Sequence, residues 1–160
     1  MILEIKKYPD SILRRKSEKV RVFDEKLRRL CAEMFETLKI NKGLGLAAPQ
    51  IGKSLSFFIV EFNDKRLIFI NPEIIKKEGE EIFEEGCLSF PGLFLKIKRP
   101  KRIEVKYQDL DGQERKIKAD GILARVIQHE LDHLDGILFI DRLSWLKKIS
   151  LIKKLKKMRA

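Results

Sequence analysis

The sequence predicts an α+β fold in which antiparallel strands pack around a central helix. Two segments place apolar residues at helical spacing, one at 24–40 and one directly after Asp120. Three short runs rich in β-branched and aromatic residues, each bounded by turn residues, are typical of strands, and a fourth strand is expected after a hairpin turn. These helices and strands do not alternate regularly along the chain, which favours the α+β class over a succession of βαβ units.

The first of these helices is expected over 24–40, with Asp24 as its N-cap. Cys31 falls on the apolar face of this helix, which predicts a thiol buried in the core. The second helix follows Asp120 and is expected to stop at Gly136, because glycine adopts the left-handed C-cap conformation without strain.

The strands are expected at 55–60, 67–70, 103–107 and 115–119, with Asp111-Gly112 as the turn of a hairpin between the last two. A basic helix is expected at about 143–158. Its apolar side is predicted to carry Trp145, Ile149, Ile152 and Leu155.

Length and composition indicate a single globular domain over residues 1–160. Apolar residues make up 44% of the chain, and no Gly/Ser/Pro-rich linker or internal repeat divides it. No run approaches the roughly 20 apolar residues that a membrane span needs, and the first residues lack the layout of a secretion signal. Two cysteines are too few for a disulfide framework. We therefore expect a cytoplasmic protein with no membrane partner.

The second helix contains an HExxH motif, formed by His129, Glu130 and His133. Residues four apart project from one face of a helix, so both imidazoles can reach one cation, with Glu130 placed to act as an acid or base. The alternative is two core histidines that bond only to backbone. Burying two titratable rings on an apolar stripe without a partner is costly, which favours a metal site.

A catalytic cation held in this way needs a third protein ligand. The third ligands of the familiar HExxH peptidases are missing, because Phe139 stands where one class has histidine and no glutamate follows Glu130. Cys87 is the strongest upstream candidate, since a thiolate binds borderline-soft divalent ions well. Three downstream carboxylates stay open as alternatives: Asp132, Asp135 and Asp141.

The segment 43–52, GLGLAAPQIG, is unusually rich in glycine and alanine. It matches the dinucleotide-binding pattern G-x-G-x-x-A, but that pattern must follow a strand and open a helix. Here the segment follows a helix, and Pro49 with Gly52 would disrupt a helix starting at this point. The pattern is therefore a chance match, and close backbone packing is the simplest interpretation.

Three segments taken together resemble the peptide deformylases. GLGLAAPQ is similar to the first motif of that family, EGCLS (85–89) to the second and QHELDHLDG (128–136) to the third, in the family's order. The resemblance implies a metal-dependent hydrolase that removes the formyl group from N-formylmethionyl peptides and releases formate. It also implies one divalent cation, most commonly Fe²⁺, with Zn²⁺, Ni²⁺ or Co²⁺ as substitutes.

Carried over position by position, the resemblance assigns a role to each matching residue. It makes Glu130 the general acid and base, with Gln50 and the backbone N–H of Leu88 as donors to the oxyanion. Glu85 and Arg99 are expected to pair, and Phe94 stands where some relatives carry arginine, which changes the expected peptide contacts. The metal ligands would be Cys87, His129 and His133, and the substrate contacts Leu44, Gly45, Gly86 and Val126.

The net charge of +11 is concentrated at the end of the chain, where 142–160 holds eight Lys or Arg residues and no acid. A cationic helix of this kind could dock transiently on ribosomal RNA, or it could pack on the domain with its basic face in solvent.

Two other functions compete with the deformylase: an HExxH metallopeptidase with an aspartate ligand, and a non-enzymatic RNA-binding domain. Neither competitor accounts for the Gly-rich segment and the Cys87 segment together, and DNA binding is not expected.

Overall fold

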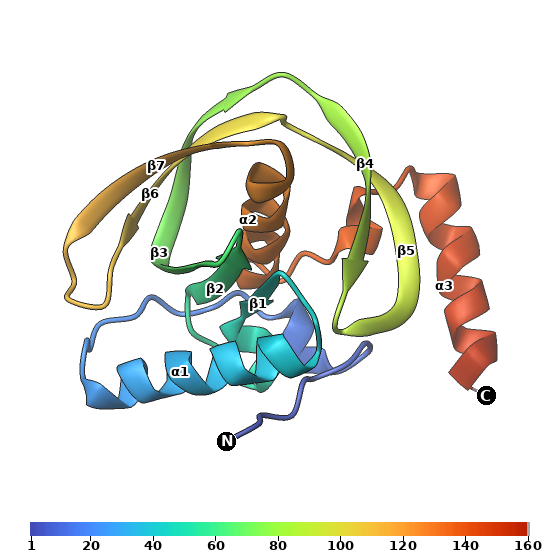
Figure 1. Cartoon of the computed structure of the whole chain (residues 1–160). Coiled ribbons are helices and arrows are strands. Elements are labelled where there is room, and N and C mark those ends of the chain that lie inside the picture. Colours follow the sequence, from blue (N-terminus) through green and yellow to red (C-terminus); the bar gives the residue numbers. More distant parts are fainter. Residues whose placement is uncertain (160) are drawn as a thin grey trace.

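This computed structural model describes residues 1–159, which contain seven strands and three α-helices (Figure 1). The α-helices are α1 (Glu25–Ile40), α2 (Gly121–Leu134) and α3 (Trp145–Arg159). The strands are β1 (Gly45–Ala47), β2 (Phe57–Phe62), β3 (Lys65–Glu78), β4 (Glu81–Cys87), β5 (Phe90–Arg99), β6 (Arg102–Gln108) and β7 (Glu114–Asp120). Short 3-10 helices span Ser11–Arg14, Ala48–Ile51 and Phe139–Arg142.

The strands form two separate antiparallel units. Five strands make one sheet in the order β1-β2-β3-β6-β7, and β4 pairs only with β5. Helix α2 lies between the two units, so that the strands surround it (Figure 1). This arrangement confirms the predicted α+β class with a central HExxH helix.

The apolar stripes of the helices determine how they pack. The inner face of α2 contributes Ala124 and Ile127 to a core shared with Phe58, Phe69 and Val105 of the five-stranded sheet. Helix α1 covers another side of β1 and β2 with Leu27, Cys31, Met34, Phe35 and Leu38. Cys31 is 1% exposed, which confirms it as a core residue.

The predicted helix boundaries hold closely. The Asp24 side chain accepts a hydrogen bond from Leu27 N, as an N-cap does. Gly136 follows the end of α2 with a φ of 72°, and a Cβ there would lie 2.4 Å from the carbonyl oxygen of Arg14. Glycine is therefore required at this position both by the backbone conformation and by the close approach of another segment.

The expected apolar face of α3 is only partly correct. Trp145 is 72% exposed, whereas Leu151 and Leu155 pack against a core cluster that includes Phe90 and Ile97 of β5. The apolar residues of this helix spread over a broad arc, so periodicity did not show which narrow stripe meets the domain. Leu155 belongs to both the expected and the observed contact face, whereas Leu151, about 100° around the helix from Ile152, was not expected to join it. No helix within residues 1–159 has the length and apolar character needed to cross a lipid bilayer.

Candidate active site

The two histidines of the HExxH motif lie on the buried face of α2. His129 is 7% exposed and His133 is 1% exposed, and their ring centroids are 5.1 Å apart. Strand β4 ends at Cys87 beside them, with Cys87 Sγ 3.4 Å from His133 Nε2. One ligand atom from each of the three residues lies within 4.8 Å of the others. The fold thus places Cys87 and His133, which are 46 positions apart in the sequence, next to each other.

The separation of Cys87 Sγ and His133 Nε2 fits two ligands of one tetrahedrally coordinated cation. Zinc binds sulfur at about 2.3 Å and imidazole nitrogen at about 2.1 Å, which places the two ligand atoms roughly 3.5 Å apart in a tetrahedral site. A thiol and an imidazole this close share either a proton or a cation. Burial lowers the pKa of His133 well below its usual value, which favours the neutral ring that a cation requires.

Two of the three aspartates that the sequence left open as third ligands bind cations of the protein itself, and the third, Asp135, is exposed at the end of α2. Asp132 accepts hydrogen bonds from Arg99 and Arg142, and Asp141 pairs with Arg14 and Lys148. Among residues 1–159, the group of Cys87, His129 and His133 is the one cluster of suitable side chains close enough to hold a cation. The geometry therefore does not favour the peptidase alternative with an aspartate ligand.

Glu85 orients His129 from the side opposite the cluster. Its Oε1 lies 2.9 Å from His129 Nδ1, which leaves Nε2 as the ring nitrogen available to a cation. Burial alone would raise the pKa of Glu85, but hydrogen bonds from His129 and Arg99 outweigh it and lower the pKa to about 2. The carboxylate is therefore ionised and can hold a proton on His129 Nδ1.

Glu130 lines a cavity next to the cluster of Cys87, His129 and His133, and is only 4% exposed. Its Oε1 has no hydrogen-bond partner among the described residues. Burial raises the pKa of Glu130 to about 7, so this carboxyl group can both take and release a proton near neutral pH. A Cβ on Gly45 would lie 2.7 Å from Glu130 Oε2, and glycine at this position therefore gives the carboxyl group its space.

Gln50 is held in a single orientation. Its Oε1 accepts a hydrogen bond of 2.9 Å from Ala47 N, and its Nε2 donates to Ser89 Oγ at 3.1 Å. The same Nε2 faces Cys87 Sγ at 3.7 Å. The amide therefore presents its N–H groups, rather than its oxygen, toward the cluster.

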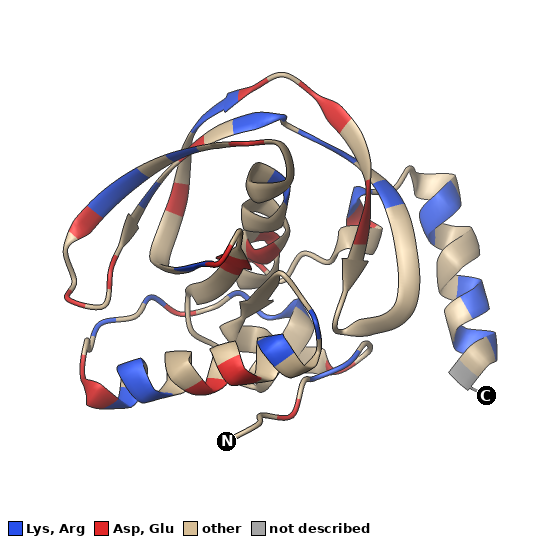
Figure 2. Cartoon of the chain, viewed as in Figure 1, with Lys and Arg blue, Asp and Glu red and all other residues tan. Residues whose placement is uncertain are grey.

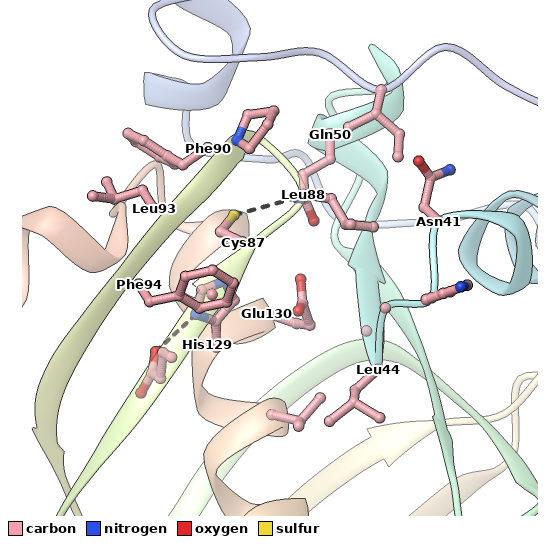
Figure 3. Close-up of a pocket in the computed structure, with 18 of the residues that line it drawn as sticks. Asn41, Leu44, Gln50, Cys87, Leu88, Phe90, Leu93, Phe94, His129 and Glu130 are labelled. Carbon is pink, nitrogen blue, oxygen red and sulfur yellow. Dashed lines mark hydrogen bonds and ion pairs between the residues drawn. The ribbon is translucent and has the colours of Figure 1, made fainter. Parts of the chain in front are cut away.

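A cavity of about 950 Å³ opens onto these groups. In Figure 3, Cys87, His129 and Glu130 point toward one another, while Gln50, Leu88 and Leu44 lie on the other side of the space. The catalytic, substrate-binding and metal-binding residues predicted from the sequence all line this cavity except His133, whose Nε2 lies 3.4 Å from Cys87 Sγ. The lining residues that the sequence predicted are Leu44, Gly45, Gln50, Gly86, Cys87, Leu88, Val126, His129 and Glu130.

The comparisons with known proteins agree with this geometry. The family model described as polypeptide deformylase matches residues 2–149. The chain belongs to the peptide deformylase family. A peptide deformylase of Dictyoglomus thermophilum is 53% identical over 142 residues, which are 89% of this chain and 93% of that protein.

Solved deformylase structures share the whole fold. The peptide deformylase of Thermus thermophilus matches with a TM-score of 0.93 and 42% identity over 98% of this chain and 94% of that one. The enzyme of Thermotoga maritima matches with a TM-score of 0.88 and 44% identity over 90% of this chain and 99% of that one. Deformylases are metal-dependent, and the cluster of one cysteine and two histidines suits that property.

Sequence reasoning missed several residues that shape this deformylase site. Ser89, 1% exposed, holds Gln50, and it in turn donates to the carbonyl oxygen of Lys6. Arg125, 7% exposed, donates to Glu85 and to two backbone carbonyls of β4 and β5. An arginine inside the apolar stripe of a helix was the available signal, because a buried guanidinium needs a carboxylate.

Proposed function

We propose that this chain hydrolyses the formyl amide at the N-terminus of formylmethionyl nascent polypeptides and releases formate. One observation carries the proposal: a thiol and two imidazoles cluster at the wall of one cavity of a peptide deformylase fold, beside a carboxyl group with a pKa near neutrality. We propose Cys87, His129 and His133 as the metal ligands and Glu130 as the general acid and base.

The chain's own residues move the proton and bind the charge that develops. A divalent cation held by the three ligands supplies Lewis acidity, which polarises the formyl carbonyl group and makes water more acidic. Glu130 takes a proton from the attacking water, whose oxygen adds to the formyl carbon. When the carbon–nitrogen bond breaks, Glu130 gives that proton to the leaving amine. Gln50 Nε2 and the backbone N–H of Leu88 donate hydrogen bonds to the oxyanion.

The substrate peptide is proposed to lie extended between two backbone segments of the cavity wall. Leu44 and Gly45 form one segment and Gly86 the other, and small residues allow a close approach of main chains. Val126 contributes apolar surface for the methionine side chain. The ring of Phe94 covers Gly86 where some relatives carry arginine, so we expect apolar rather than ionic contacts beyond the first residue.

The decisive experiment measures formate release from formyl-Met-Ala-Ser, with acetyl-Met-Ala-Ser and unformylated Met-Ala-Ser as controls. We expect formate from the formyl peptide alone. Cleavage between methionine and alanine without formate would instead indicate a peptidase. Protein that binds no divalent cation and shows only salt-dependent RNA binding would support a non-enzymatic RNA-binding domain.

Gln50→Ala tests the proposed oxyanion donor. Loss of one such donor typically lowers kcat about a hundredfold or more, and we expect the cation content to stay unchanged because Gln50 is not a ligand. Activity assays and metal analysis on the same sample measure both effects. An unchanged kcat would overturn the assignment.

We propose Fe²⁺ as the resident cation. A ligand set of one thiolate and two imidazoles does not by itself distinguish Fe²⁺ from Zn²⁺, Ni²⁺ or Co²⁺, so the proposal rests on the family resemblance. Metal analysis of protein purified without oxygen, followed by formate assays after loading with each cation, tests it. Iron below stoichiometric amounts and full activity with zinc would overturn it.

Helix α3 is the proposed site of transient ribosome association. It carries only basic charged residues (Figure 2), and Lys153, Lys154, Lys156 and Lys157 are exposed. Changing these four lysines to glutamate keeps the packing of Leu151 and Leu155, which removal of all residues after Asp141 would destroy. We expect weaker, less salt-dependent cosedimentation with ribosomes. Equal binding by the variant would refute the idea.

We also propose that residues 1–160 act as a single catalytic domain in the cytoplasm. Strand β2 supports the single domain, because Phe57 and Ile59 enter one core cluster and Phe58 and Val60 enter another. A single calorimetric unfolding transition is expected, and two separated transitions would refute it. Fractionation of the source cells tests the location.

A further inference from the structure

A chain of alternating charges leads away from the candidate metal site. It begins at His129 Nδ1, 2.9 Å from Glu85 Oε1, and continues with Glu85 Oε2, 2.6 Å from Arg99 Nε. Arg99 Nη1 lies 2.9 Å from Asp132 Oδ2, and Asp132 Oδ1 lies 2.6 Å from Arg142 Nη2. The chain thus passes from a proposed metal ligand to a residue outside the cavity lining.

Its inner members have very little freedom. The side chains of Arg99 and Glu85 are 4% and 5% exposed, and Arg99 uses Nε and Nη2 as a fork on the two oxygens of Glu85. The remaining nitrogen, Nη1, binds Asp132. Because the guanidinium group is planar and rigid, movement of Asp132 shifts the fork on Glu85 as well.

Arg142 is the outer end of this chain. It binds both oxygens of Asp132, with Nε 3.0 Å from Oδ2 and Nη2 2.6 Å from Oδ1. Its side chain is 44% exposed, whereas that of Asp132 is 11% exposed. Arg142 closes the short helix Phe139–Arg142, whose residues Phe139 and Ile140 are buried, so its backbone is fixed.

We propose that Arg142 is a positioning residue for the metal site, acting through Asp132, Arg99 and Glu85 on the orientation of His129. Without Arg142, Asp132 Oδ1 loses its only partner among residues 1–159. The carboxylate can then turn, which loosens the hold of Arg99 on Glu85. The metal-binding part of this inference does not require the proposed deformylase activity. The kinetic part rests on it.

The first test measures the release of Zn²⁺ from loaded protein into excess chelator. Groups that hold a metal-binding histidine typically change metal affinity 10- to 100-fold when removed; for Arg142→Ala, two links further out, we expect release about three- to tenfold faster. The matched control is Arg115→Ala, which removes a surface pair with Asp109 at 2.9 Å. We expect the control to release Zn²⁺ at the rate of the unchanged protein.

A second test separates positioning from general stabilisation. In an Asp132→Asn background the chain is already broken, so adding Arg142→Ala should change Zn²⁺ release less than twofold. Full additivity of the two substitutions, or release from Arg142→Ala at the unchanged rate, would overturn the proposal. Should Arg142→Ala not fold, Arg142→Lys provides the same comparison, because lysine cannot bind both oxygens as a fork.

Kinetics provide the third readout. Misorientation of His129 should lower kcat for the formyl peptide several-fold, while KM stays within about twofold, because Arg142 does not line the cavity. A rise in KM alone would contradict the proposed route. If the unchanged protein releases no formate, the proposed function fails, but the Zn²⁺ measurements still decide on Arg142.

Discussion

Gly45→Ala should disable the site without touching a ligand. A Cβ at this position would lie 2.7 Å from Glu130 Oε2 and 2.8 Å from Glu130 Cγ, where ordinary contact begins at 3.4 Å. Glu130 is 4% exposed and cannot turn out into solvent, so the carboxyl group must shift within the cavity. The overlap requires a displacement of roughly 1 Å, and a misplacement of this size can lower a rate about a hundredfold.

The assay combines formate release with metal analysis and thermal unfolding. We expect kcat to fall about a hundredfold with full cation content, and the free energy of unfolding to fall by about 1–3 kcal/mol, the usual cost of overpacking. Gly43→Ala is the matched control, because a Cβ there meets the flexible ends of Leu38 and Leu88 instead of Glu130. A Gly45→Ala enzyme that keeps kcat within threefold would show that the position of Glu130 is not critical.

Three further substitutions test the electrostatics. Glu130→Gln should abolish formate release. At pH 8 with chelator present, the same substitution should raise the free energy of unfolding by up to about 3 kcal/mol: burial raises the pKa of Glu130 to about 7, so ionisation of the folded protein costs stability as pH rises above 4.5. Urea titration measures this free energy, and an unchanged or lower value would contradict the reasoning. Glu85 has its pKa lowered to about 2, so it stabilises the fold above pH 4.5 and this stability is lost as pH falls toward 2; in Glu85→Gln, acid titrations should lack that loss. Cys87→Ser should lower Zn²⁺ affinity at least tenfold in a chelator competition, and retained affinity would favour an oxygen ligand.

The elements predicted correctly from the sequence are those that bury one face. Periodicity predicted α1 and α2 within one or two residues at most ends, and β6 and β7 almost completely. Strands β4 and β5 were not predicted, because they leave Ile82, Phe83 and Phe94 exposed and carry glycine and proline, which obscures the usual alternation. Strand β1 has only three residues, too few for a periodic signal.

The candidate site divides in the same way. His129, Glu130 and His133 belong to one helix turn, so their spacing alone brought them together. The partners of Glu85 are 14, 40 and 44 residues away in sequence, at Arg99, Arg125 and His129. No local pattern encodes contacts at such separations, and only the resemblance to a known family indicated the first of them.

The different environments of the Cys31 and Cys87 thiols give a way to measure how many molecules carry metal. Burial raises the pKa of Cys31 to about 12, so this thiol stays protonated and unreactive at any physiological pH. Cys87 lies in the open cavity, where a coordinating cation would occupy its sulfur. A thiol dye added to native protein should therefore react once per molecule that lacks metal and not at all with loaded ones. Its absorbance would therefore report which fraction of a preparation carries metal, before any substrate is added.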